Sequence, residues 1–248
     1  MIRKLKIFVR NQIWKFLKLS YVLPSGIKLV IKNDSDWVIY NEIFVNNEYD
    51  AVFKKLEKEN NEIIIFDLGA NVGYFSLKAA DFLLNSKINN FKIIAIEGDI
   101  ENYQEFLKRV NQKIVFEKIK IIHGLVGKTS GSAILEKDSY HFGYKVNHQI
   151  NNQTHKSKHL INYVDLNQFV TANNSITIIK CDIEGSENIF IKEYEHLLRK
   201  TNLFICEFHY KEDEVSALDV KLKEYGFENF KLLRSDKRYD INVKLYWK

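Results

Sequence analysis

The 248-residue sequence is short of the residues on which disulfide-rich and zinc-binding proteins depend. It has one proline, Pro24, and two cysteines, Cys181 and Cys206, which are too few for a disulfide framework. No cluster of cysteine and histidine has the spacing of a zinc site. Both cysteines lie in apolar runs, so we expect them to be buried and reduced. With 46% hydrophobic and 13% aromatic residues, the chain can bury one complete core, and this composition excludes a disordered protein.

The first twenty residues lack acidic side chains and carry six of the 37 basic ones. Without those six, 31 basic residues face 32 acidic ones, so we expect no general nucleic-acid binding surface on the body. The apolar residues recur at helical spacing with cations between them, which is not the pattern of a secretory signal. No run here is long enough to span a bilayer. We expect a cytoplasmic protein whose N-terminal amphipathic helix either docks on the body or makes peripheral contact with the inner face of a membrane.

From residue 63 onward, short apolar runs alternate with helical stretches. The expected strands are Ile63–Leu68, Phe91–Ile96, Ile119–His123, Ile176–Cys181 and Leu203–Phe208, and the expected helices cover residues 72–84, 101–112, 186–199 and 212–225. This alternation is typical of an α/β fold whose mostly parallel sheet is covered by helices on both faces.

The remaining segments complete the expected organisation. We divide the chain into an N-terminal extension, residues 1–48, with a short strand at 27–32, and a ligand-binding domain, residues 49–248, which begins with a helix at 49–58. Residues 228–247 predict an edge hairpin whose turn is Arg-Ser-Asp-Lys-Arg. Residues 128–162 are polar and without periodicity, so we expect an irregular stretch near the strand ends, where a substrate lid would lie.

A buried strand runs directly into a small-residue turn between Ile63 and Gly73. Gly69 and Gly73 permit a tight turn and the close approach of a ligand at the carboxyl end of the strand. The spacing D-x-G-x-x-x-G differs from the dinucleotide pattern G-x-G-x-x-G, and Asp67 would repel a pyrophosphate. An acid here suits a ligand that carries an ammonium and a sulfonium group. The alternative is a purely structural turn in which Asn71 caps the following helix.

The next apolar run ends in a second acid, Glu97. An acid at this position of a Rossmann-like sheet commonly accepts hydrogen bonds from the two ribose hydroxyls. Glu97 lies 28 residues after Gly69, more than the ~20 typical of dinucleotide folds, and the polar insert at residues 85–90 accounts for the extra length. A solvated surface glutamate is the alternative.

Three acids, Asp182, Glu184 and Glu187, follow the buried run Ile176–Cys181 within six residues. Like charges this close repel one another, so they require a cation or a proton donor. Asp182 and Glu184 suit either a divalent metal bound through oxygen, or a general base with neighbours that bind substrate hydroxyls. Glu187 also fits the first turn of a helix, where the helix dipole favours an acid.

The following strand places two titratable residues close to its end. Glu207 and His209 are two positions apart, so they share one face of the strand. His209 can take up a proton near neutral pH or ligate a metal, and the alternative is a structural histidine.

Taken together, these stretches resemble the FkbM family of S-adenosylmethionine-dependent methyltransferases. The matching pieces are Asp67–Tyr74, Ile96–Gly98, Lys180–Glu187, Asn47–Tyr49 and Asn162–Leu166. The resemblance covers about residues 40–210. It implies the class I methyltransferase fold, with a seven-stranded sheet, and methylation of an oxygen on a sugar, glycolipid, polyketide or related natural product. Gly98 stands where the family usually has proline, which should matter little for ribose binding. Cys181 stands where the family often has an aliphatic residue, and it is apolar enough to be neutral.

The sequence therefore predicts an O-methyltransferase that acts on a hydroxyl of a small molecule or glycan, with S-adenosylmethionine as cofactor. The predicted cofactor-binding residues are Asp67, Gly69, Ala70, Asn71, Gly73, Tyr74, Glu97 and Gly98. The predicted catalytic residues are Asp182, Glu184 and His209, with Asp182 and Glu184 as the ligands if Mg²⁺ or Mn²⁺ takes part. One alternative is a metal-dependent nucleotide-sugar glycosyltransferase, because Asp182-Ile183-Glu184 resembles its acid-x-acid motif. The other is a non-catalytic membrane-surface protein on a methyltransferase fold.

Overall fold

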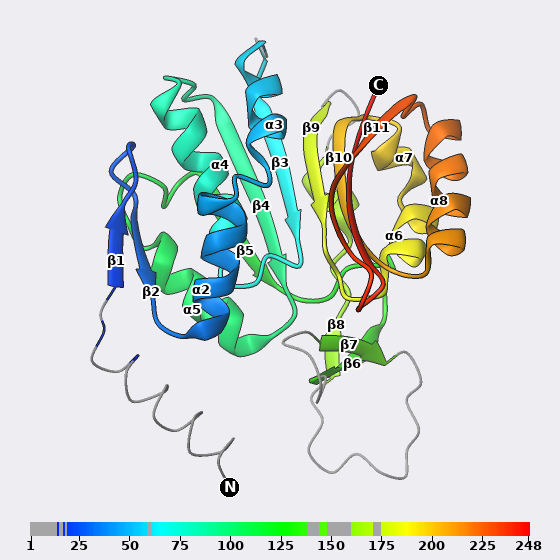
Figure 1. Cartoon of the computed structure of the whole chain (residues 1–248), viewed down its shortest axis with the longest axis horizontal. Coiled ribbons are helices and arrows are strands. Elements are labelled where there is room, and N and C mark those ends of the chain that lie inside the picture. Colours follow the sequence, from blue (N-terminus) through cyan, green and yellow to red (C-terminus); the bar gives the residue numbers. More distant parts are fainter. Residues whose placement is uncertain are drawn as a thin grey trace, which may run out of the picture.

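A seven-stranded sheet forms the centre of the protein (Figure 1). The computed structural model describes Trp14, Leu17 and residues 19–58, 61–137, 144–147, 160–170 and 175–248, so nearly all of the predicted N-terminal helix lies outside the described residues. The strands of the sheet, in chain order, are β3 (Ile63–Leu68), β4 (Phe91–Glu97), β5 (Ile119–His123), β9 (Ile176–Cys181), β10 (Thr201–His209), β11 (Asn229–Asp236) and β12 (Ile241–Trp247).

The strand order is β11-β12-β10-β9-β3-β4-β5. Strands β10, β9, β3, β4 and β5 are parallel, and β12 runs antiparallel to both of its neighbours. The predicted mostly parallel sheet and its antiparallel end are therefore confirmed. The predicted turn residues are wrong in part, because Arg234, Ser235 and Asp236 continue β11 beyond a bulge and the turn falls at residues 237–240.

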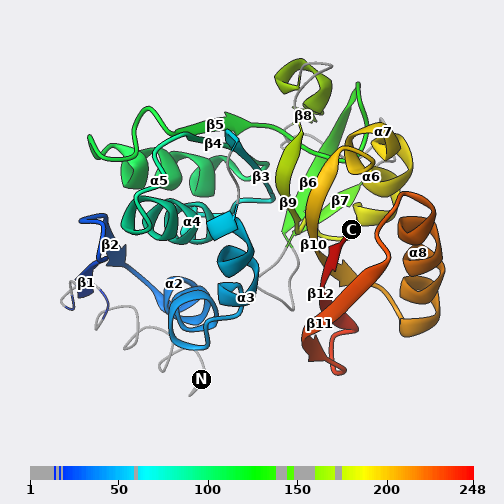
Figure 2. The same ribbon diagram turned by 90° about the horizontal axis from the view of Figure 1, so that it is seen from above.

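Helices cover both faces of the sheet, as predicted (Figure 2). On one face lie α4 (Tyr74–Asn85) and α5 (Ile100–Val110); on the other lie α6 (Glu187–Glu193), α7 (Glu195–Leu198) and α8 (Glu212–Glu224). The two-residue period of a strand explains the two layers. Ile63 and Ile65 of β3 enter the core under α4, whereas Ile64 and Phe66 enter the core under α6 and α8. The predicted single helix at 186–199 is two helices, which meet at Tyr194.

Both cysteines are buried and free, as expected. They are register partners on the adjacent strands β9 and β10. Among the described residues, no helix combines the length and the apolar composition that crossing a membrane requires.

Residues 19–58 pack against the face that carries α4 and α5. They form the hairpin β1 (Leu19–Val22) and β2 (Lys28–Ile31), then α2 (Asp34–Tyr40), the π-helix η1 (Asn41–Val45), α3 (Asp50–Phe53) and the 3₁₀ helix η2 (Lys54–Lys58). Leu29 and Ile43 belong to the same apolar core as Leu77 of α4. The predicted strand at 27–32 corresponds to β2, and the predicted helix at 49–58 to α3 and η2.

A second, three-stranded sheet lies near the carboxyl ends of the main strands (Figure 1). It consists of β6 (Ser132–Lys137), β7 (Tyr144–Asn147) and β8 (Leu160–Asn162), all antiparallel. The expectation that residues 128–162 are irregular is wrong for these strands. Ala133 and Ile161 pack with Leu125 into a small apolar cluster of their own, and strands this short leave little periodicity in the sequence.

Candidate cofactor and acceptor site

Two adjoining cavities lie where β3, β4, β9 and β10 end. The smaller cavity is lined by the loops after β3, β4 and β9, and the larger one, of about 510 Å³, extends toward α2, η1 and β11. Gly69, Asn71, Asp182 and Glu184 line both cavities. In parallel sheets, ligands bind at the carboxyl ends of the strands, so this position fits a cofactor and a second substrate side by side.

The loop after β3 is shaped by two glycines that have no room for a side chain. A Cβ on Gly69, whose φ is +71°, would lie 1.6 Å from the carbonyl oxygen of Asp182. A Cβ on Gly73, whose φ is +89°, would lie 2.0 Å from the ring of Phe106. Both glycines are therefore required by the packing of the loop against the protein itself, and Gly69 lets the loops after β3 and β9 approach each other closely.

Glu97 joins the loops after β3 and β4. Its Oε2 accepts a hydrogen bond from the backbone N–H of Asn71 at 2.7 Å, and its Oε1 accepts one from Asp99 at 2.7 Å. Burial raises the pKa of Glu97 to about 7, although both backbone hydrogen bonds oppose the shift. Glu97 and Gly98 line the smaller cavity. Glu97 therefore lies where a carboxylate could reach the ribose of a bound cofactor, as predicted for it from the sequence.

The structure does not place Asp67 on the surface of either cavity. Its side chain is fully buried, accepts a hydrogen bond from Ser76 Oγ at 2.6 Å, and lies 3.5 Å from Lys180 Nζ. Lys180 in turn donates to the carbonyl oxygen of Gly69 at 2.8 Å and lies 3.4 Å from Asp182 Oδ2. Although burial opposes its charge, the carboxylates of Asp182 and Asp67 raise the pKa of Lys180. Asp67 thus acts on the site through a buried lysine.

Ala70 and Tyr74, two of the predicted cofactor-binding residues, line the larger cavity and not the smaller one. The Tyr74 hydroxyl donates to the carbonyl oxygen of Val30 at 3.3 Å, and its ring lies under the guanidinium of Arg109. Arg109 Nη2 also forms a buried ion pair with Asp36 of α2 at 2.8 Å. These contacts fasten α2 to the loop that follows β3.

The predicted catalytic acids occupy a sharp turn after β9. Glu184 and Gly185 have φ values of +53° and +91°. The fully buried Glu187 holds this turn, because its Oε1 accepts from the backbone N–H groups of Ile183 and Gly185 at 3.3 and 3.0 Å. The turn presents Asp182 and Glu184 at the boundary between the two cavities.

His209 lies among acids from three directions. Its Nδ1 is 3.1 Å from Glu187 Oε1, and its Nε2 is 3.5 Å from Glu184 and 3.8 Å from Glu207. Burial alone would lower the pKa of His209, but the hydrogen bond and charge of Glu187, with the charges of Asp182 and Glu184, raise it to about 10. His209 is therefore a cation at neutral pH, so it cannot serve as a general base in that state.

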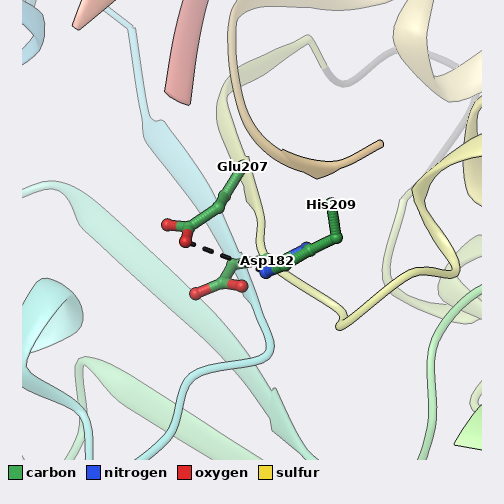
Figure 3. Close-up of side chains that lie close together, drawn as sticks. All are labelled: Asp182, Glu207 and His209. Carbon is green, nitrogen blue, oxygen red and sulfur yellow. Dashed lines mark ion pairs between the residues drawn. The ribbon is translucent and has the colours of Figure 1, made fainter. Parts of the chain in front are cut away.

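Asp182, Glu207 and His209 converge from β9 and β10 (Figure 3). One ligand atom from each lies within 4.8 Å of the others, which is close enough for a shared metal ion. The structure groups Asp182 with Glu207 and His209, and Glu184, the predicted second metal ligand, stands outside this group.

The larger cavity contains a further cluster that the sequence did not predict. Arg234 of β11 pairs with Glu207 at 2.9 Å, with Glu48 at 3.3 Å and with Glu42 at 3.4 Å. Burial raises the pKa of both Glu42 and Glu48, while the charge of Arg234 opposes the shift. Glu48 lies within Asn47–Tyr49, one of the stretches that fit the family pattern. Arg234 lies in the segment predicted to form a turn, and nothing in the local sequence indicates that it belongs to the site.

The strand order and the position of the cavities define a class I methyltransferase fold. Residues 67–228 match the family described as methyltransferase FkbM domain. The chain belongs to this family of S-adenosylmethionine-dependent methyltransferases, as the sequence motifs predicted.

A solved structure supports this fold, and a second matches less closely. Methyltransferase FkbM from Methylobacillus flagellatus KT is 20% identical, with a TM-score of 0.51; the match covers 76% of this chain and 44% of that one. The chain thus spans less than half of that protein. Precorrin-6y C5,15-methyltransferase from Geobacter metallireducens GS-15 is 10% identical, with a TM-score of 0.45, and the match covers 81% and 88% of the two chains. No curated protein matches the sequence.

Proposed function

We propose that the protein transfers a methyl group from S-adenosylmethionine to a hydroxyl group of a sugar or glycan. The observation that carries this proposal is that the carboxylate of Asp182 lies, beside that of Glu184, on the wall shared by the two cavities. A methyl donor in the smaller cavity and an acceptor in the larger one would meet at this side chain. Holding two reactants in line can supply ~7–11 kcal/mol of the rate enhancement.

The residues of the smaller cavity fit the methyl donor. Glu97 can accept hydrogen bonds from ribose hydroxyls while it keeps its two backbone partners, because each carboxylate oxygen has a second lone pair. Leu125 and Val126 supply apolar surface for an adenine ring in the same cavity. When bound, S-adenosylmethionine supplies a methyl group on a positively charged sulfur, which is already a good leaving group.

On the acceptor side, a side chain of the protein must take up the proton of the attacking hydroxyl group. Asp182 is 29% exposed at its side chain and reaches the shared wall, so its carboxylate can accept that proton as the oxygen–methyl bond forms. Lys180, 3.4 Å from Asp182, keeps the carboxylate in place. The cationic His209 holds Glu184 and Glu207 beside it, and these acids can accept hydrogen bonds from other hydroxyls of the acceptor.

The charges of the larger cavity support an uncharged acceptor rich in hydroxyl groups. Among the described residues, six acidic side chains line this cavity, against Lys180, Arg234 and His209. Each of these three cations already faces at least two carboxylates. A phosphate group in this cavity would therefore meet a net negative charge, and each cation among the described lining residues is already paired with carboxylates. This counts against the alternative function, a glycosyltransferase that binds a nucleotide sugar.

A divalent metal on Asp182, Glu207 and His209 is the second scheme that the geometry suggests. Against it, the protein's own cations already face these groups, since Lys180 faces Asp182 and Arg234 pairs with Glu207 at 2.9 Å. His209 would also have to lose its proton before it could bind a metal. We therefore favour base catalysis by Asp182 without a metal.

The deciding experiment compares Asp182→Asn with wild type, because this change removes charge and preserves volume. We expect S-adenosylmethionine affinity to be retained, by calorimetry, and turnover to fall about 10²–10⁴-fold. Turnover is followed by mass spectrometry of glycans and metabolites from cells that carry each gene. Asp240→Asn, in the exposed turn before β12, is the matched control. Wild-type levels of methylated product with Asp182→Asn would remove this residue from the mechanism.

A further inference from the structure

The N-terminal region carries an exposed apolar surface that, apart from Val38 in the wall of the larger cavity, the catalytic proposal does not use. Sixteen large apolar side chains are exposed among the described residues, and seven of them fall within residues 17–45. They are Leu17, Leu19, Tyr21, Val22, Trp37, Val38 and Val45. Soluble proteins normally scatter such side chains singly, so this concentration calls for a partner.

Aromatic contacts make this surface continuous between β1 and α2. The Tyr21 ring lies 6.5 Å from that of Tyr40, and Trp37 stacks on Tyr40 at 6.1 Å. Tyr40 in turn stacks on Phe44 at 5.2 Å. Tyr21 and Trp37 remain 49% and 44% exposed within this row. Tyrosine and tryptophan are the side chains that prefer the boundary between lipid and water.

The adjoining chain carries the charge that a lipid surface attracts. Residues 1–18, which lead directly into β1, contain six basic residues and no acid. The last two, Lys15 and Lys18, stand four residues and one residue before Leu19 in the sequence. Each cation near an anionic leaflet strengthens binding about fivefold, and aromatic side chains add to the attraction.

We propose that the face formed by β1 and α2, together with the basic residues 1–18, docks the protein on an anionic lipid bilayer. The cavity wall contains Val38 and Ile39 of α2, so the docked protein would hold its larger cavity close to the membrane. The docking itself does not depend on the proposed methyl transfer, and its test requires no acceptor.

The experiment is co-sedimentation of the full chain with vesicles of phosphatidylcholine, with and without phosphatidylglycerol. We expect wild type to bind only the anionic vesicles, and added salt to weaken the binding. Trp37→Asp should weaken binding at least about tenfold. A full-length variant with all six basic residues of 1–18 changed to Gln should also lose binding. The matched control is Val220→Asp, because Val220 is 63% exposed on α8, on the opposite side of the molecule (Figure 1).

Circular dichroism and thermal melting confirm that each variant is folded before binding is compared. The proposal fails if wild type stays in the supernatant with anionic vesicles. It also fails if Trp37→Asp binds like wild type, since the basic segment would then act without this face. A dimer of the wild type that Trp37→Asp dissociates, without vesicle binding, would instead assign the face to a second copy of the chain.

Discussion

On the cofactor side of the site, the loops after β3 and β4 meet through glycines and backbone hydrogen bonds, whereas on the acceptor side β9, β10 and β11 meet through charged side chains. The backbone N–H of Gly69 donates to the carbonyl oxygen of Ile96 at the end of β4, and Glu97 accepts from two backbone N–H groups. On the other side, Arg234 alone faces three carboxylates. The first arrangement depends on the size of each residue and the second on the balance of charge.

This difference has a chemical reason. An invariant cofactor can be held by a loop whose shape is set by the backbone, because the ligand never changes. The proposed acceptor would be recognised by the number and placement of its hydroxyl groups, which requires side chains that donate or accept in fixed positions. Substitutions that change size should therefore damage the cofactor side most, and substitutions that change charge should damage the acceptor side most.

The largest effect on the cofactor side is expected for Gly69→Ala. The new Cβ would overlap the carbonyl oxygen of Asp182, and φ at this position is +71°. We expect a loss of about 3 kcal/mol or more in the free energy of unfolding, measured by urea denaturation. Gly131→Ala is the matched control, because Gly131 has φ +92° but no described atom lies within 4 Å of the position that its Cβ would take. An equal loss in both variants would mean that backbone strain, and not the contact with Asp182, is responsible.

Glu97→Gln tests the one cofactor-side residue where charge should matter. A carboxylate binds hydroxyl donors more strongly than an amide, so S-adenosylmethionine affinity should fall about 10–100-fold by calorimetry at pH 8. Burial raises the pKa of Glu97 to about 7 in the folded protein, so its protonated form stabilises the folded state. This contribution to the free energy of unfolding is complete below the ordinary pKa of glutamate and is lost as the pH rises through 7.

The ionised form of Glu97 accepts hydrogen bonds from ribose hydroxyls more strongly than the protonated form, and wild-type affinity should therefore rise as the pH passes from 6 to 8. The glutamine variant should lose this dependence. A pH profile shared by both proteins would assign the titration to another group.

On the acceptor side, Glu187→Gln removes charge while it keeps the size of a fully buried side chain. We expect the pKa of His209 to fall from about 10 toward the ordinary histidine value of about 6.5, because its hydrogen-bonded anion is lost. An NMR titration of the histidine ring protons, assigned with His209→Gln, measures the change. Glu184→Gln, 3.5 Å from the other ring nitrogen, should lower this pKa less. The reverse order would contradict the role given to Glu187.

The smallest effect is expected from chelation. If Lys180, Arg234 and His209 supply the positive charge of the acceptor side, a chelator should change the turnover of purified protein less than about twofold. Turnover that stops with chelator and returns with magnesium or manganese would favour the metal scheme, on Asp182, Glu207 and His209.

The cofactor side was the more predictable half because its residues are close together in sequence. Gly69, Asn71, Gly73 and Glu97 belong to two strand–loop stretches, and a strand followed by a glycine loop is a local pattern. The role of Asp67 could not be found in this way. Its register partner in the adjacent strand is Lys180, 113 residues later, and strand pairing of this kind leaves no local signal.

The acceptor side was predicted only where it is local. Asp182, Glu184 and His209 follow apolar runs, but Arg234 reaches the site through the pairing of β11 with β12. Glu42 and Glu48 reach it because η1 packs on α4, in a segment assigned to the N-terminal extension. The three-stranded sheet was missed for another reason, since strands of three to six residues are too short to show a period.

The contact between Glu48 and Arg234 joins residues 186 positions apart, and this separation orders events during protein synthesis. A ribosome that adds ~5–20 residues per second needs roughly 10–40 s to travel from one to the other. The glycine loop and Glu97 are complete early in that interval, whereas Glu42 and Glu48 have no guanidinium partner until β11 emerges. The nascent chain therefore gains the elements of a cofactor pocket well before it can close the wall of its acceptor cavity.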